Sequence, residues 1–85
     1  MQKYIGKTVE VSGVVTEDVE YKNDDYRVRI KTNYGLVYIM LGKQIDLSRS
    51  DMLTVAGKAQ SGFGDFVAFF YHPEVKNIAH PQTPD

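Results

Sequence analysis

The chain has 85 residues, contains no cysteine and carries a formal net charge of -1. A chain of this length forms one domain around a single core, and without cysteine it makes neither disulfides nor thiolate metal sites. The near-neutral charge excludes a protein that binds nucleic acid through a uniformly basic surface, so any such role must depend on a local patch.

Hydropathy and cysteine usage set expectations for location. Hydrophobic residues make up 42% of the chain, but no apolar run is long enough to cross a bilayer, so we expect no membrane span. No signal peptide is visible at the start, and the lack of cysteine suits a reducing compartment, which favours a cytoplasmic location. We expect one domain over residues 1–78 and a flexible tail over residues 79–85.

The first predicted strand, residues 6–16, organises the rest of the chain. Val9 and Val11 alternate with polar residues, which is the two-residue period of a half-buried strand. Gly13 interrupts this run, and a glycine there usually marks a bend that lets one long strand belong to two sheets. Residues 53–59 show a similar alternation that ends at a glycine. We therefore predict two bent strands of one barrel.

The loop after the first strand, residues 17–25, is acidic and rich in Asn and Asp, which predicts a hairpin loop. Residues 26–32 then alternate, so Val28 and Ile30 are expected to face the core. The other face of this strand carries a row of cations: Arg27, Arg29 and Lys31.

Residues 36–41 follow a turn at residues 33–35 and are apolar on both faces. Such a run is typical of a central strand, or of a strand whose outer face binds a partner. Tyr38 and Met40 are expected on the outer face. The connection over residues 42–50 is too short for more than a helical turn, so the helix content should be low.

A fourth strand is predicted over residues 51–60, followed by a glycine-rich loop with Phe63 at its tip. Phe63 is expected to pack onto the mouth of the barrel; if it stands free, it is a stacking or docking residue. The fifth strand, residues 66–71, ends before Pro73, because proline cannot donate to a ladder. Residues 74–78 can extend this strand as an edge.

The fifth strand carries an excess of aromatic side chains. Phe69 and Tyr71 alternate with Phe66, Ala68 and Phe70, so one of these two sets must face outward unless both sides of the strand are covered. This excess is the main indication of a surface for self-association or for a partner.

This pattern of strands resembles the OB-fold. The segments YIGKTVEVSGVV at residues 4–15 and DMLTVAG at residues 51–57 are similar, more narrowly, to the bacterial tRNA-anticodon-like group of OB domains. The likeness covers about residues 4–78. It implies an all-β, five-stranded OB-fold barrel with little or no helix, and binding of nucleic acid. The fold alternative is an SH3-like barrel, which also has five short, bent strands.

The sequence departs from the nucleic-acid binders of that group at two places. The first loop is acidic instead of basic, and the connection over residues 42–50 is short where many OB-folds carry a helix. Both departures lower the affinity expected for a polyanion.

Signatures of catalysis are missing. The sequence contains no phosphate-binding loop, no paired histidines at zinc-binding spacing and no nucleophile elbow. Asp24 and Asp25 are adjacent, but we interpret them as solvated residues of a turn. We interpret His72 as a histidine at the end of a strand. We therefore expect a protein that is not an enzyme and needs neither a metal nor a cofactor.

The predicted binding surface is the outer face of the second and third strands, where OB-folds generally bind oligonucleotides or oligosaccharides. Bases stack on aromatic rings for about 1 to 3 kcal/mol each, while cations follow the phosphates. The pattern predicts weak, sequence-tolerant binding of single-stranded DNA or RNA, with Tyr26 and Phe63 as flanking rings. The predicted binding residues are Tyr21, Lys22, Tyr26, Arg27, Arg29, Lys31, Tyr38, Phe63 and Phe66.

The alternative function is a protein-interaction or scaffolding module within a larger assembly, or a module that self-associates. Alternating Arg and Lys on the solvent-exposed face of a strand also keep a sheet soluble without any ligand, and tyrosines fit half-buried sheet positions well. In addition, the acidic residues of the first loop repel an approaching phosphate chain. The sequence leaves both functions open.

Overall fold

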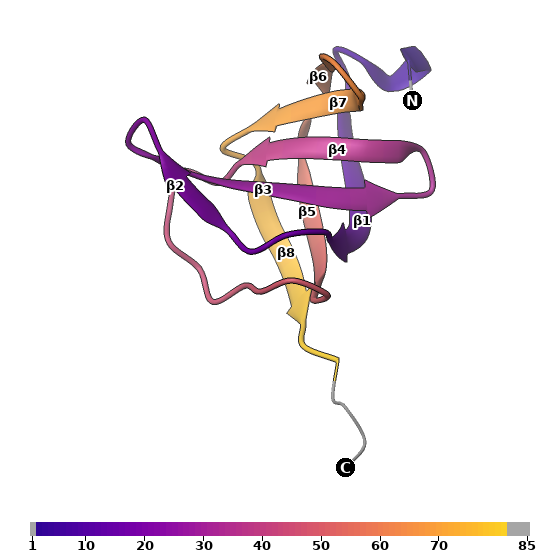
Figure 1. Ribbon diagram of the computed structural model, residues 1–85. Helices are drawn as coiled ribbons and strands as arrows, with labels where there is room; N and C mark the ends of the chain where they lie inside the picture. Colours follow the sequence, from indigo (N-terminus) through magenta and orange to yellow (C-terminus); the bar gives the residue numbers. More distant parts are fainter. Residues whose placement is uncertain (1, 82–85) are drawn as a thin grey trace.

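The computed structural model describes residues 2–81, and these form an almost purely β structure (Figure 1). A 3-10 turn, η1 (Gln2–Tyr4), precedes the strands, and no helix within the described part is long and apolar enough to cross a membrane. The all-β class and the low helix content are therefore confirmed. The strands are β1 (Thr8–Val15), β2 (Glu20–Lys22), β3 (Asp25–Thr32), β4 (Gly35–Met40), β5 (Met52–Lys58), β6 (Gln60–Ser61), β7 (Phe66–Tyr71) and β8 (Glu74–Ala79).

The strands form one hydrogen-bonded sheet in the order β6-β7-β4-β3-β1-β5-β8, with β2 paired to β3. Neighbouring strands are antiparallel except β4 and β7, which are parallel. In Figure 1, β3, β4 and β7 run across the view while β1, β5 and β8 cross behind them. The strands expected from the sequence are subdivided. Ala59 separates β5 from β6, and residues 72–73 separate β7 from β8.

β1 changes its partner strand near Gly13. Residues Thr8 to Val14 pair with β5, whereas Val14 and Val15 pair with β3. A Cβ placed on Gly13 would lie only 2.5 Å from the backbone oxygen of Lys31. The glycine is therefore required because the end of β3 approaches the backbone of β1 closely. β1 is therefore shared between two partner strands, as its glycine indicated, but both belong to one sheet and not to the two sheets predicted.

The core contains the side chains that the alternation of β1 and β3 predicted. Val11 and Val15 are 4% and 1% exposed, and Val28 and Ile30 are 2% and 0% exposed. β4 is a central strand between β3 and β7, as its two apolar faces indicated. The remaining core side chains come from β4, β5, β7 and the connections between strands: Val37, Ile39, Leu41, Leu47, Leu53, Val55, Ala59, Ala68 and Phe70.

A β-bulge at the start of β7 changes the face on which Phe66 lies. The pairing of β7 with β4 skips Val67, so two residues of β7 occupy the space of one. Strict alternation would place Phe66 on the same face as Ala68, which is buried. The ring of Phe66 instead lies 5.1 Å from the ring of Tyr38, which Phe69 contacts at 6.2 Å. The predicted alternation, which grouped Phe66 with Ala68 and Phe70, is therefore broken at the bulge, and Phe66 lies beside the predicted binding residue Tyr38.

The C-terminal strand continues past the predicted end of the domain. β8 is an edge strand that ends at Ala79, but it pairs with β5 and does not extend β7 as the sequence had suggested. Nδ1 of the next residue, His80, lies 2.8 Å from Oδ2 of Asp51, so this position contacts the body of the domain. The part of the predicted tail that comprises residues 82–85 lies outside the described residues.

Candidate nucleic-acid interface

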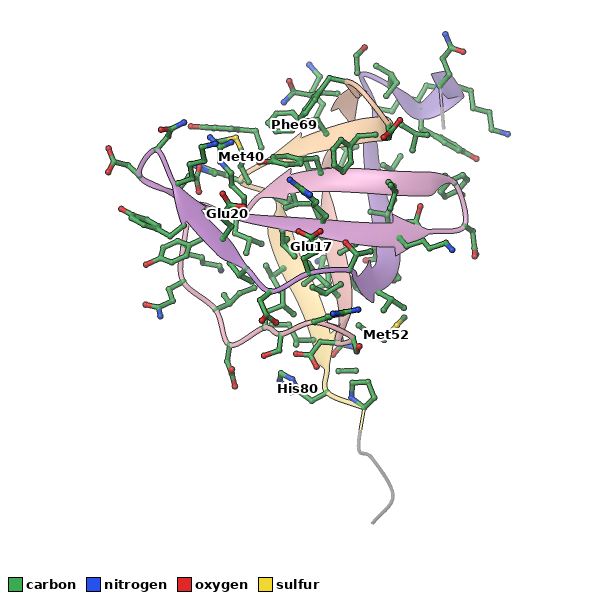
Figure 2. All side chains as sticks on the ribbon, in the orientation of Figure 1. Glu17, Glu20, Met40, Met52, Phe69 and His80 are labelled. Atoms are coloured by element: carbon green, nitrogen blue, oxygen red, sulfur yellow. The ribbon has the colours of Figure 1, made fainter. Side chains whose placement is uncertain are left out.

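The register between β3, β4 and β7 aligns outward side chains in rows across the three strands. Each row has a cation on β3, an apolar or aromatic residue on β4, and an aromatic residue on β7. We call this surface the outer face. Its rows are Arg27, Met40 and Tyr71; Arg29, Tyr38 and Phe69; and Lys31, Leu36 and Phe66. Figure 2 shows two members of this surface, Met40 and Phe69, on the same side of the sheet.

Tyr38 lies at the centre of the outer face and is only 8% exposed. Its ring is covered by other aromatic side chains, with centroid distances of 5.3 Å to Phe63, 5.1 Å to Phe66 and 6.2 Å to Phe69. Tyr38 was predicted as a binding residue. In this arrangement its ring supports the surrounding rings and does not offer a free face for stacking.

Phe63 packs back onto this aromatic cluster and still keeps 53% of its surface exposed. The loop that carries it is tight, because Phe66 donates a backbone hydrogen bond to Phe63 at 2.9 Å. Gly62 has no room for a side chain, since a Cβ there would overlap the backbone oxygen of Phe66. Gly64 adopts a φ of 57°, which favours glycine. The loop therefore holds one face of the Phe63 ring towards solvent.

The arginines of β3 lie against the aromatic cluster. Nη1 of Arg27 donates to the hydroxyl of Tyr38 at 3.0 Å, and its guanidinium lies 6.0 Å from that ring. The guanidinium of Arg29 lies 5.8 Å from the ring of Phe66. Nε of Arg27 is buried and has no hydrogen-bond partner. Lys31, the third cation of the row, is exposed.

Two carboxylates of the first loop and β2 lie beside these arginines. Oε2 of Glu17 is 3.4 Å from Nη1 of Arg29. Glu20 pairs directly with Arg27 across β2 and β3. Figure 2 shows both glutamates on the side of β3 and β4 that faces the viewer. The acidic loop was predicted from the sequence, but its contact with the cation row was not.

The three remaining predicted residues lie on β2 and at the start of β3. The rings of Tyr21 and Tyr26 contact each other at 4.7 Å. Tyr26 lies two residues before Val28, on the same face of β3, and packs against the core. It is therefore on the opposite side of β3 from Arg27. Tyr21 is opposite Tyr26 in the ladder, and exposed Lys22 ends β2. The structure therefore does not bring Tyr26 to the outer face as a flanking ring.

The interpretation of Asp25 as a solvated turn residue is wrong, whereas exposed Asp24 fits it. Asp25 is 6% exposed, and its Oδ2 lies 2.8 Å from Nε2 of His72. Its Oδ1 accepts hydrogen bonds from the backbone N–H groups of Tyr26 and Gly42, each at 2.8 Å. Burial raises the pKa of Asp25, but the hydrogen bonds from His72, Gly42 and Tyr26 outweigh it, so this pKa lies below its ordinary value.

His72 connects this buried carboxylate to the outer face. It ends β7 as predicted, with a φ of 50°, and its ring stacks on Tyr71 at 3.9 Å. A second pair repeats this chemistry, because Oδ2 of the buried Asp51 contacts His80 and accepts from the backbone N–H of Ser48 at 2.8 Å. No spacing signal in the sequence links either histidine to its aspartate. Within residues 2–81, no three or more His, Cys, Asp or Glu side chains gather at a possible metal site.

Comparison with known proteins gives no match, because no family model, no curated protein and no solved structure is significantly similar to this chain.

Proposed function

We propose that this chain is a non-catalytic binding module of OB type that binds single-stranded nucleic acid on the outer face, weakly and with little sequence preference. The observation that carries the proposal is the row arrangement, in which cations of β3 and aromatic rings of β7 lie on one surface. Single strands are bound by this combination, because the cations follow the phosphates and the rings stack on the bases.

The strand pairing supports the OB part of the proposal. An OB-fold is a partly open Greek-key barrel whose second and third strands form the binding face. In this chain β1 is shared between β5 and β3, and β4 pairs in parallel with β7. β3 and β4 are then the second and third strands of the barrel, and the loop that carries Phe63 lies at one border of the face.

Two exposed rings are the stacking residues of the proposal. Phe63 is 53% exposed and Tyr71 is 56% exposed. The ring of Phe63 packs on the buried ring of Tyr38. Each stacked base contributes about 1 to 3 kcal/mol to binding. The carboxylate of Glu17 reduces the separate contribution of the cations to phosphate binding, because it already neutralises Arg29. The expected affinity for a single strand is therefore low.

A second candidate function is a contact with another protein. The specific observation in its favour is that Arg29 is already paired with Glu17, while the outer face carries exposed aromatic side chains. Aromatic surfaces with few free charges are typical of the cores of protein interfaces. The exposed aromatic side chains of this surface are Phe63 and Tyr71.

The test is a titration of fluorescently labelled oligo-dT and oligo-U at low salt, read by anisotropy. Phe63→Ala and Lys31→Ala should each weaken binding, by roughly threefold to tenfold, because each removes one stacking ring or one phosphate contact. Lys58→Ala is the matched control, since exposed Lys58 lies at the end of β5 and not on the outer face.

Absence of binding to both oligonucleotides at low salt would overturn the nucleic-acid proposal and favour the protein contact. In that case, light scattering at increasing protein concentration should show a rising mass that the change Phe63→Ser abolishes.

A further inference from the structure

The acidic segment of residues 17–20 lies against the arginines of the outer face. We propose that it acts as an autoinhibitory latch in which the Glu17 carboxylate occupies the position of a phosphate on Arg29, Glu20 adds negative charge near Arg27, and a bound single strand displaces the Glu17 carboxylate. The proposal rests on the proposed function, because it concerns the regulation of the same face.

The latch is anchored on both sides of Glu17 by contacts that do not involve its carboxylate. The backbone N–H of Thr16 donates to the carbonyl oxygen of Arg29 at 3.0 Å. On the other side, Oδ1 of Asp18 accepts from the backbone N–H of Arg49 at 2.9 Å. These anchors carry the side chain of Glu17 to Arg29. They also allow the carboxylate to leave Arg29 while the loop stays in place.

The acidic segment and the arginines border the same cleft. Glu17, Glu20, Arg27 and Arg29 line one narrow cleft together with Asp18 and Tyr38, and its volume is about 10 Å³. This space accommodates about one water molecule. A phosphate oxygen that takes the place of the Glu17 carboxylate on Arg29 must displace that carboxylate.

An unsatisfied donor remains in the closed arrangement. Nε of Arg27 is buried without a hydrogen-bond partner, although its Nη1 donates to Tyr38. Buried donors without partners destabilise the state that contains them. Glu20, which is opposite Arg27 in the ladder, is exposed and makes no contact with this donor. This guanidinium belongs to a residue that lines the cleft, and its unsatisfied donor favours an anion nearby.

The contact that must break is weak. The side chains of Arg29 and Glu17 are 42% and 65% exposed, and their charged atoms are 3.4 Å apart. Ion pairs at such exposure contribute little to stability. A nucleic-acid strand gains from counterion release when it replaces the glutamate. The latch is therefore expected to lower the affinity by a modest factor and not to abolish binding.

The test compares the double variant Glu17→Gln/Glu20→Gln with the wild type in titrations with labelled oligo-dT at low salt. The double variant should bind roughly threefold to tenfold more tightly, and its affinity should depend more steeply on salt, because Arg29 loses its paired carboxylate and a negative charge near Arg27 is removed. The matched control is Glu10→Gln/Asp46→Asn, which changes the net charge equally at two exposed positions outside the outer face. It should change the affinity by less than about twofold.

The outcomes separate the latch from the function of the face. Binding by the wild type with an equal gain in the latch variant and the control would overturn the latch and leave the outer face as the binding site. No binding by either the wild type or the latch variant would overturn both proposals.

A measurement without nucleic acid gives a second check. The side-chain Nε–Hε resonance of Arg29 in the free protein should shift on Glu17→Gln and not in the control variant. An unchanged Arg29 resonance would overturn the latch independently of any binding result.

Discussion

At the scale of single residues, the most consequential contact is that of Asp25 with His72, because it connects the start of β3 to the end of β7 at the border of the outer face. The carboxylate receives its hydrogen bonds from His72 and from two backbone N–H groups, and all three distances are 2.8 Å. His72 in turn stacks on Tyr71, one of the exposed rings of the face. The orientation of that ring therefore depends on a buried carboxylate.

The change Asp25→Asn should destabilise the fold by about 1 to 3 kcal/mol at neutral pH, because charge-assisted hydrogen bonds are lost at a buried position. Since the folded-state pKa of Asp25 lies below its ordinary value of 3.8, its contribution is present above that pH and is lost as the pH falls further. Urea denaturation should show the gap between wild type and variant at pH 7 and a smaller gap in strong acid.

Asp24→Asn is the control for this prediction, since Asp24 is exposed in the neighbouring turn. It should change stability by no more than about 0.5 kcal/mol. A gap between wild type and Asp25→Asn that stays constant down to strong acid would contradict the assignment of the ionised carboxylate.

At the scale of elements, the path of β1 is set by the absence of a side chain at Gly13. The strand can pass from β5 to β3 only because the backbone of Lys31 lies where a Cβ would be. β7 shows the second local device, a bulge at Val67 that turns Phe66 to the outer face. Each feature involves residues of a single strand. The glycine changes which strand pairs with β1, and the bulge changes the face of the sheet on which Phe66 lies.

Gly13→Ala should destabilise the domain by about 2 kcal/mol or more, since the added Cβ forces β1 away from β3. The midpoint of urea unfolding measures this effect. Val14→Ala is the comparison, because the adjacent Val14 is 41% exposed and its truncation leaves the crossing of the strands intact. Equal stability of Gly13→Ala and the wild type would mean that the close approach to Lys31 does not constrain the fold.

At the scale of the whole molecule, the charge distribution limits what the outer face can bind. The net charge is -1, so binding of a polyanion depends on the three cations of β3 and not on a general attraction. The outer face is formed by the neighbouring strands β3, β4 and β7. The strands β1, β5 and β8 contribute side chains to the core.

The logarithm of the affinity for oligo-dT should fall with the logarithm of salt concentration with a slope no steeper than about -2, since each phosphate contact on a single strand contributes about -0.7. Anisotropy titrations over a series of salt concentrations measure this slope. A much steeper slope would show that cations outside β3 contact the nucleic acid, and would move the site away from the outer face.

Alternation along the chain was sufficient to predict the all-β class, the buried faces of β1 and β3 and the cation row. The two apolar faces of β4 left open a central strand or a strand whose outer face binds a partner. Only the tertiary structure determined that Tyr26 lies away from that row, that a bulge separates Phe66 from the face of Ala68 and Phe70, and that Glu17 pairs with Arg29. The two aspartate and histidine pairs were equally invisible in the sequence. The physical reason is that a two-residue period specifies the face of each side chain, whereas strand register and loop path specify its distant neighbours.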